Sequence, residues 1–152
     1  MIKYKRITVN IQSRLDNLPN IFAKYPQVDF AILFGSYAAG NPGPLSDVDI
    51  AYMLSDVEPK VAFEIDCKLF VEITQCLGTD EISFICLNEA PVTVRFGVIA
   101  NGKVIYLRNE NKLLDFKVNT MKHYIDTKEI REEYYKELFD AIRRRHRARR
   151  SG

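Results

Sequence analysis

Two apolar runs of strand length, residues 28–35 and 47–54, flank an insert rich in glycine and proline. The first run, VDFAILFG, is almost unbroken, as in a strand that is buried on both faces. The second run, DVDIAYML, is polar at its start and apolar further on. A connection that only reverses the chain needs about two to six residues. This longer insert therefore predicts two strands whose connection has a further task.

Segments with helical periodicity alternate with these and further strands. Residues 10–25 carry apolar side chains on one face and contain Pro19, so we expect this helix to kink or restart there. Residues 58–77 have apolar side chains every four positions, a proline near the start and Gly78 at the end, as in a long capped helix. The other expected elements are strands at 81–88 and 104–107, and helices at 91–100 and from about 111 onward. This order predicts an α/β (α+β) fold in which helices flank a small sheet.

The length of 152 residues suits one domain, and 47% hydrophobic and 28% charged residues are ordinary for a globular protein. No apolar run has the length of a membrane span, and the first ten residues lack the apolar centre of a signal peptide. We therefore expect a cytoplasmic protein without a membrane partner. The cysteines Cys67, Cys76 and Cys86 form no CxxC pair, and we expect them to be small buried side chains in a reducing compartment.

Basic residues gather near the C-terminus, where RRRHRARR, from Arg143 to Arg150, contains six arginines. Removing these six from the 22 basic residues leaves 16 against 20 acidic ones, so the rest of the chain carries a net charge of about −4. The tail is either a solvated helix end or a contact for an anionic partner, such as RNA or an acidic protein surface. We expect its deletion to weaken a complex in a salt-dependent way.

The insert has chemically distinctive residues at both ends. Asp47 and Asp49, two positions apart on a strand, project from the same face. Two such carboxylates repel each other unless a cation or proton intervenes, and the pair suits Mg²⁺ with phosphate oxygens and water as its other ligands. Gly35 lets a ligand approach the backbone closely, and the Ser36 hydroxyl with nearby N–H groups can bind phosphate. Together the residues predict a site for a metal and a phosphate.

The segment GSYAAGNPGPLSDVDI resembles the Gly-Ser, ten residues, Asp-x-Asp signature of the DNA polymerase β-like nucleotidyltransferases. The chain is most similar to the minimal nucleotidyltransferase (MNT) antitoxins, whose partner toxin is a HEPN-domain ribonuclease. Residues 86–110 and 124–142 extend the resemblance, which covers roughly 10–142. It implies a small mixed sheet flanked by helices, with a nucleotidyltransferase domain at 1–115 and a helical extension with a basic tail at 116–152, in one compact unit.

The resemblance also implies an activity and a set of roles. The protein would be a Mg²⁺-dependent transferase that moves AMP from ATP to a tyrosine of the toxin. The nucleotide would be bound by Gly35, Ser36, Tyr37 and Ser46. Two Mg²⁺ ions would be held by Asp47 and Asp49, with Glu81 as a further catalytic acid. The alternative is a relative that neutralises a toxin, or holds a nucleotide, by binding alone.

Four positions depart from the family pattern and keep that alternative open. Ser83 stands where the third acid of the family is expected, and Cys86 occupies the position of the next acid. Tyr37 and Ala39 follow the Gly-Ser pair at positions where family members commonly have arginines. Glu81, two residues before Ser83, would lie on the same strand face and could replace the missing acid. A small-molecule acceptor is less well supported, because the chain shows no second domain to bind it.

The segment 124–142 has an apolar face rich in tyrosine, which is common at protein interfaces. It could equally pack on the body of the protein, at least in its first half. The sequence leaves both arrangements open.

Overall fold

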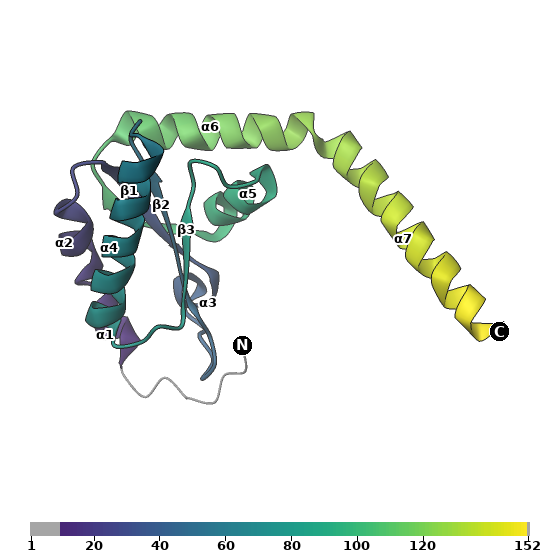
Figure 1. Ribbon diagram of the computed structural model, residues 1–152, viewed down its shortest axis with the longest axis horizontal. Coiled ribbons are helices and arrows are strands. Elements are labelled where there is room, and N and C mark those ends of the chain that lie inside the picture. Colours follow the sequence, from purple (N-terminus) through teal and green to yellow (C-terminus); the bar gives the residue numbers. More distant parts are fainter. Residues whose placement is uncertain (1–9, 152) are drawn as a thin grey trace.

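The computed structural model describes residues 10–151 and is built around a four-stranded sheet (Figure 1). The strands are β1 (Val28–Phe34), β2 (Val48–Leu54), β3 (Ile82–Cys86) and β4 (Lys103–Leu107), so all four expected strands are present. Their order across the sheet is β3-β2-β1-β4. β1 is antiparallel to both β2 and β4, whereas β2 and β3 are parallel. The sheet is therefore mixed, as the sequence resemblance implied.

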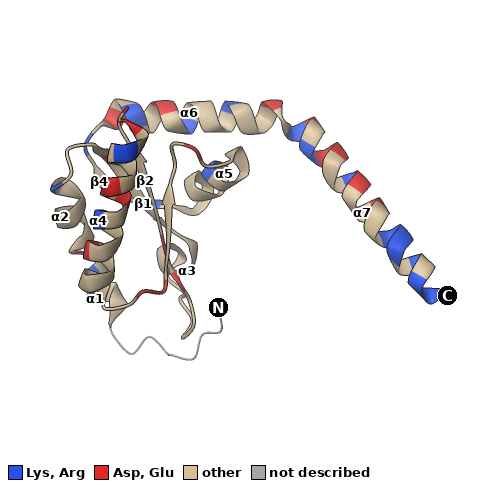
Figure 2. Ribbon diagram, in the orientation of Figure 1, with Lys and Arg blue, Asp and Glu red and all other residues tan. Residues whose placement is uncertain are grey.

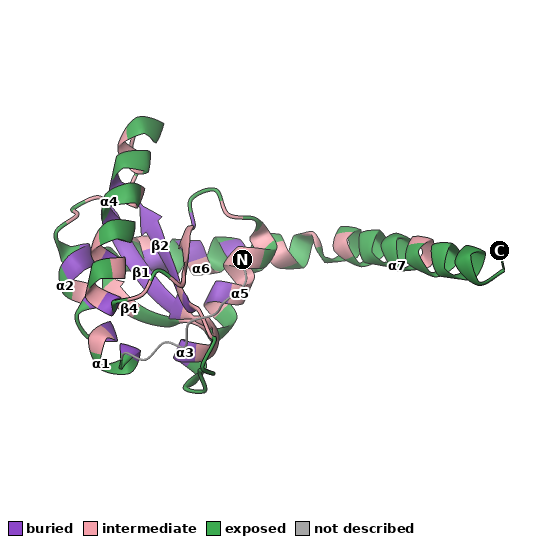
Figure 3. Cartoon of the chain, turned by 60° about the horizontal axis from the view of Figure 1, so that its bottom comes forward, coloured by how far each residue is buried: buried purple, intermediate pink, exposed green. Residues whose placement is uncertain are grey.

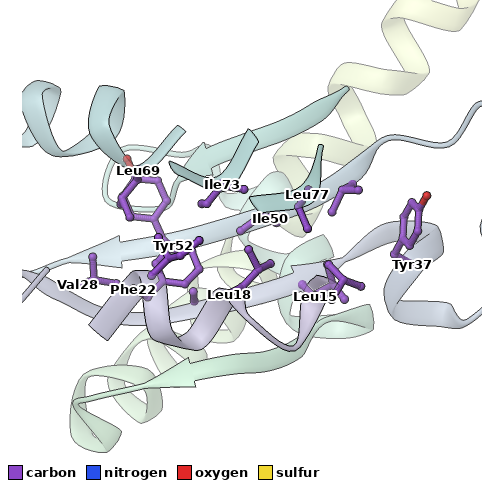
Figure 4. Close-up of a cluster of buried hydrophobic side chains, with 14 of the residues drawn as sticks. Leu15, Leu18, Phe22, Val28, Tyr37, Ile50, Tyr52, Leu69, Ile73 and Leu77 are labelled. Carbon is purple, nitrogen blue, oxygen red and sulfur yellow. The ribbon is translucent and has the colours of Figure 1, made fainter. Parts of the chain in front are cut away.

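Helices cover both faces of this sheet. One face packs against α1 (Ile11–Leu15), α2 (Leu18–Ala23) and α4 (Pro59–Leu77), and Figure 4 shows this first core cluster. The other face packs against α5 (Val92–Asn101) and α6 (Glu110–Asp126), which form the second core cluster. Because side chains alternate along a strand, β1 gives Ala31 and Leu33 to the first cluster and Phe30 and Ile32 to the second. Its unbroken apolar sequence follows from this burial on both faces.

Local sequence explains where the helices begin and end. The first expected helix is broken between α1 and α2, and Pro19 lies in the first turn of α2. α4 starts at Pro59 and stops before Gly78, whose left-handed backbone (φ 69°) places its N–H on the Thr74 carbonyl. The side chains that α4 buries recur every four residues: Ile65, Leu69, Ile73 and Leu77.

The C-terminal segment forms two helices, α6 and α7 (Lys128–Arg150), which meet at Thr127. α6 buries Leu113 and Phe116 against the sheet. α7 buries none of its residues and projects from the body as a long arm (Figure 3). The expected domain boundary between residues 115 and 116 falls inside α6 and stays a prediction.

A stack of three side chains fixes the junction between α6 and α7. The ring of Tyr124 lies 3.8 Å from that of Phe96 in α5, at an interplanar angle of 5°. The guanidinium of Arg131 in α7 covers the same Tyr124 ring, 3.8 Å from its centroid. Arg131 also donates a hydrogen bond to the Thr127 hydroxyl. The stack therefore joins the start of α7 to α5 through the end of α6.

Two features differ from the expectations. The insert after β1 begins with a short helix, α3 (Gly35–Ala39), instead of running as a loop throughout. The cysteines are free, but Cys67 is exposed, so the expectation of buried cysteines was wrong there. Cys67 is two residues from both Ile65 and Leu69, which places it on the outer side of α4.

None of the helices within residues 10–151 is both long and apolar enough to cross a membrane. Residues 1–9, on which the expectation about a signal peptide depends, lie outside the described residues.

Candidate active site

Asp47 and Asp49 lie where β2 begins. Asp49 is the second residue of β2, and Asp47 is the residue directly before the first one, Val48. Val48 and Ile50 are fully buried in the first core cluster. Because side chains alternate along the strand, the two carboxylates face the opposite side of the sheet, where both are partly exposed. Asp47 and Asp49 therefore stand at the start of β2, on the face of the sheet away from the first core cluster.

Gly35 brings the end of β1 against Asp49. Phe34, the last residue of β1, pairs with Asp49 across the two strands. Gly35 then turns the chain into α3 with a φ of 69°, a conformation that favours glycine. A Cβ atom at this position would lie 2.0 Å from Oδ2 of Asp49, so the carboxylate occupies the space that a side chain would fill. The backbone of Gly35 and the carboxylate of Asp49 are therefore direct neighbours in the structure.

The other residues of the insert hold this arrangement in place. Tyr37, expected to contact a nucleotide, is 7% exposed and packs in the first core cluster, where burial raises the pKa of its hydroxyl (Figure 4). Ser46, also expected at the nucleotide, accepts a 2.8 Å hydrogen bond from the Gly43 amide and closes the turn before Asp47. Tyr37 thus packs in the core on the other face of the sheet, and Ser46 stabilises the turn that leads to Asp47. Their contact with a nucleotide stays a prediction.

β3 forms the edge of the site next to β2. Ser83 pairs with Asp49 in the parallel register, so both side chains are on the same face. Glu81 lies just before β3, and its carbonyl accepts a 3.1 Å hydrogen bond from the Val48 amide. One carboxylate oxygen of Glu81, Oε2, is buried and has no hydrogen-bond partner among the described residues. A buried oxygen of this kind is costly unless a donor or a cation reaches it.

The donor set fits Mg²⁺ better than a metal bound by protein alone. Within residues 10–151, no three His, Cys, Asp or Glu side chains come together as a possible metal-binding group. Structural zinc sites use four protein ligands, whereas Mg²⁺ is commonly bound by one or two carboxylates together with phosphate oxygens and water. Asp47 and Asp49 therefore suit a Mg²⁺ ion that is shared with a phosphorylated ligand.

A groove of about 640 Å³ begins at the Gly-Ser pair and extends along α5. Its lining residues are Phe34, Gly35, Ser36, Ala39, Asn41, Ile85, Thr93, Val94, Gly97, Val98 and Asn101. A Cβ atom at Gly97 would meet nothing within 4 Å, so this glycine leaves open space in the groove. The volume lies in the range of small-molecule sites, and the mostly apolar wall suits a ring system next to the polar end at Ser36.

The α5 wall of the groove was not predicted from the sequence. Only Gly97, in the interior of the expected helix, signals it. The expected site residues Gly35 and Ser36 do line the groove, whereas Ser83 and Glu81 lie at the β3 side of the aspartates.

Comparison with solved structures shows the same fold in several chains. A toxin–antitoxin structure with AMP-PNP contains a chain that is 22% identical, with a TM-score of 0.67 over 86% of this chain and 99% of the other. A tri-AMPylated Shewanella oneidensis HEPN toxin in complex with an MNT antitoxin gives 20% identity and a TM-score of 0.65, covering 85% and 98% of the two chains. Another S. oneidensis structure gives 19% identity and a TM-score of 0.61, covering 87% and 98%.

A comparison with the curated proteins gave no match. The family model described as polymerase beta, nucleotidyltransferase matches residues 16–111, more than half of the chain, and this segment includes the Gly-Ser pair, both aspartates and α5. The chain therefore belongs to the polymerase β nucleotidyltransferase family.

Proposed function

We propose that this nucleotidyltransferase transfers AMP from ATP, in a Mg²⁺-dependent reaction, to a protein partner and thereby acts as the antitoxin of a HEPN-type ribonuclease toxin. The observation that carries the reaction is the contact between Gly35 and Asp49, because the Gly-Ser turn that meets this carboxylate also lines the groove of about 640 Å³. Since ATP and Mg²⁺ are abundant in the cytoplasm, we expect the protein to act there.

Different residues bind the phosphates, the nucleoside and the metal ion. The Gly35 backbone and the Ser36 hydroxyl bind phosphate oxygens, and the apolar wall at Val94 and Gly97 receives the nucleoside. Asp47 and Asp49 hold Mg²⁺, which supplies charge neutralisation at the reacting phosphate. The partner's hydroxyl oxygen forms a bond to the α-phosphorus, the bond to pyrophosphate breaks, and the hydroxyl proton is released to a base. Catalysis is mainly by positioning.

Glu81 is the candidate for that base. Its buried Oε2 lacks a hydrogen-bond partner among the described residues, and its backbone is bonded to β2 beside the aspartates. The residue of β3 that pairs with Asp49 is Ser83, which supplies no carboxylate. Glu81 is therefore the acid of this segment that could take the third role.

The proposed partner rests on the fold. The similar chains come from structures described as toxin–antitoxin complexes, one with AMP-PNP and one with a tri-AMPylated HEPN toxin. A protein acceptor also suits a site at the end of the two inner strands, β1 and β2, that is not enclosed by a second domain within residues 10–151.

A second candidate function is neutralisation by binding alone. Ser83 favours it, because a serine beside Asp49 neither binds a metal strongly nor removes a proton. In this case the groove would still hold a nucleotide, but no group would be transferred.

Incubation with labelled ATP, Mg²⁺ and the product of the neighbouring gene separates the two candidates. We expect label on the partner, and its loss with the isosteric double variant Asp47→Asn/Asp49→Asn. Neutralisation of a toxin without label, unchanged in that variant, would favour binding alone.

The groove has its own test, which does not depend on the acceptor. Gly97→Leu fills open space without forcing the backbone, so the variant should fold but bind an ATP analogue more weakly. Gly97→Ala adds only one methyl group and serves as the control. Equal affinity of the two variants would place the nucleotide elsewhere.

A further inference from the structure

α7 carries a broad apolar face that nothing in the described chain covers. Six large side chains on this helix are at least 41% exposed: Ile130, Tyr134, Tyr135, Leu138, Phe139 and Ile142. At 100° per residue they occupy one half of the helix surface. The helix projects from the body, and none of its residues is buried (Figure 3). A helix gains most of its stability by packing its apolar face, so this face calls for a partner.

Charge is distributed unevenly along the same helix. The first part carries five acidic residues, Glu129, Glu132, Glu133, Glu137 and Asp140, against three basic ones. The end carries six arginines between residues 143 and 150. Figure 2 shows red and blue residues along the first part of α7 and only blue ones toward its end. An RNA would meet the acidic part as well as the arginines, so the apolar face with its acidic flanks favours a protein partner.

We infer that α7 pairs with α7 of a second copy of this chain, in antiparallel orientation. Antiparallel pairing brings the acidic part of each helix beside the arginines of the other, whereas parallel pairing would place like charges together. The chain thus supplies its own complement, and the pair is symmetric. With Lys136 at the centre of the contact, residues 128–144 of the two helices overlap, which gives a contact about 25 Å long.

The spacing of residues supports this pairing in detail. Lys136 marks the middle of the apolar segment along the helix. If the two helices are aligned at this level, Ile130 of one copy lies opposite Ile142 of the other. Glu132 and Arg143 are eleven residues, or three turns, apart, so they flank the apolar face on the same side. In an antiparallel pair the same flanks meet, which brings Glu132 of one copy near Arg143 of the second copy. Two such ion pairs would form, one at each end.

The inference does not depend on the proposed reaction, because α7 contributes no residue to the groove. The two grooves would lie on separate bodies held apart by the paired arms, and each body would remain open to a further partner.

The test is the mass of the full-length protein in solution, by light scattering or sedimentation, over a hundredfold range of concentration. We expect twice the mass of one chain at low salt, with weaker association from about 0.05 M to about 0.5 M NaCl. Leu138→Gln/Ile142→Gln should give a monomer. Lys136→Gln, on the opposite side of the helix from Leu138, should leave the dimer intact. A monomer at every concentration and salt would overturn the pairing.

Charge reversal tests the orientation. A variant with Glu129, Glu132 and Glu133 changed to Lys, and a variant with Arg143, Arg144 and Arg147 changed to Glu, should each associate more weakly alone. A mixture of the two should form a mixed dimer, and a chain that carries both sets of changes should form a dimer with itself. If the doubly reversed chain stays monomeric, the antiparallel pairing is wrong. It is also wrong if the Arg-to-Glu variant still forms the dimer and loses only the binding of an RNA oligonucleotide.

Discussion

The backbone of Gly35 and the carboxylate of Asp49 share a space that leaves no room for a side chain. Gly35→Ala would add a Cβ atom at 2.0 Å from Oδ2 and hold a non-glycine residue at φ 69°. We expect a loss of about 1–3 kcal/mol in unfolding free energy from the backbone strain. Displacement of Asp49 should also lower nucleotidyl transfer by about a hundredfold, or about 2.7 kcal/mol.

Gly40→Ala is the matched control. Gly40 also has a positive φ, 79°, but a Cβ atom there meets nothing within 4 Å. Gly40→Ala should therefore lower the unfolding free energy through the same backbone strain and leave nucleotidyl transfer nearly unchanged. Equal losses of transfer in the two variants would show that strain, and not the Asp49 contact, controls the site. Urea unfolding and the labelling assay measure the two effects separately.

Ser83 offers a test by gain of function. Its side chain shares a face with Asp49 through the β2–β3 register, so Ser83→Asp would add a third carboxylate to the site. We expect tighter Mg²⁺ dependence and transfer that is roughly tenfold faster, equivalent to about 1.4 kcal/mol in the barrier. Ser83→Asn has nearly the same shape without the charge and should not show the gain. A lower rate for Ser83→Asp at saturating Mg²⁺ would contradict this role for the position.

At the scale of elements, the sequence predicted best where hydrophobic periodicity was long. β1, β2 and α4 follow from unbroken or regularly spaced apolar residues, and the Asp-x-Asp pair follows from the two-residue period of a strand. α3 was missed because five residues carry almost no periodic signal, and its formation depends on the burial of Tyr37 and Ala38. The groove was missed because it exists only once α5 has docked beside the Gly-Ser turn.

A contact between α4 and the two residues that follow α2 makes stability depend on pH. The Tyr25 hydroxyl donates a 2.9 Å hydrogen bond to Glu72, and Lys24 lies 3.2 Å from the same carboxylate. Burial, and then the hydrogen bond and charge of Glu72, raise the pKa of Tyr25 to about 12 from its usual 10.0. Because the folded pKa is the higher one, this contribution is complete below pH 10 and is lost as the pH rises toward 12.

Tyr25→Phe should therefore unfold more easily at neutral pH, by about 1 kcal/mol for the lost hydrogen bond. Its difference from the parent protein should shrink between pH 10 and pH 12, the interval set by the two pKa values. Glu72→Gln keeps a hydrogen-bond acceptor and, since burial is the larger cause, should keep most of the pH dependence. A difference that grows with pH in urea unfolding would reverse the assigned sign.

At the scale of the whole molecule, changes in the body, residues 10–127, should lower the unfolding free energy much more than removal of the arm, α7. α6 belongs to the body: Phe116 is 6% exposed and lies 5.4 Å from the Phe30 ring, so Phe116→Ala should cost about 3–5 kcal/mol. α7 buries nothing, and its described link to the body is the stack of Arg131 on Tyr124. A chain that ends at Thr127 should therefore lose at most about 1 kcal/mol, the range of a cation–π contact.

Thermal unfolding of the intact and shortened chains would also distinguish a folded arm that pairs from one that does not. If α7 joins two copies, the melting temperature of the intact chain should rise with protein concentration, because only the folded state associates. The chain ending at Thr127 should melt at one temperature over the same range. If shortening lowers the stability by several kcal/mol at every concentration, α7 supports its own body, and the exposed face would need a different explanation. If both chains melt independently of concentration, the arm is free, and the arginines of its end serve a contact that forms only with another partner.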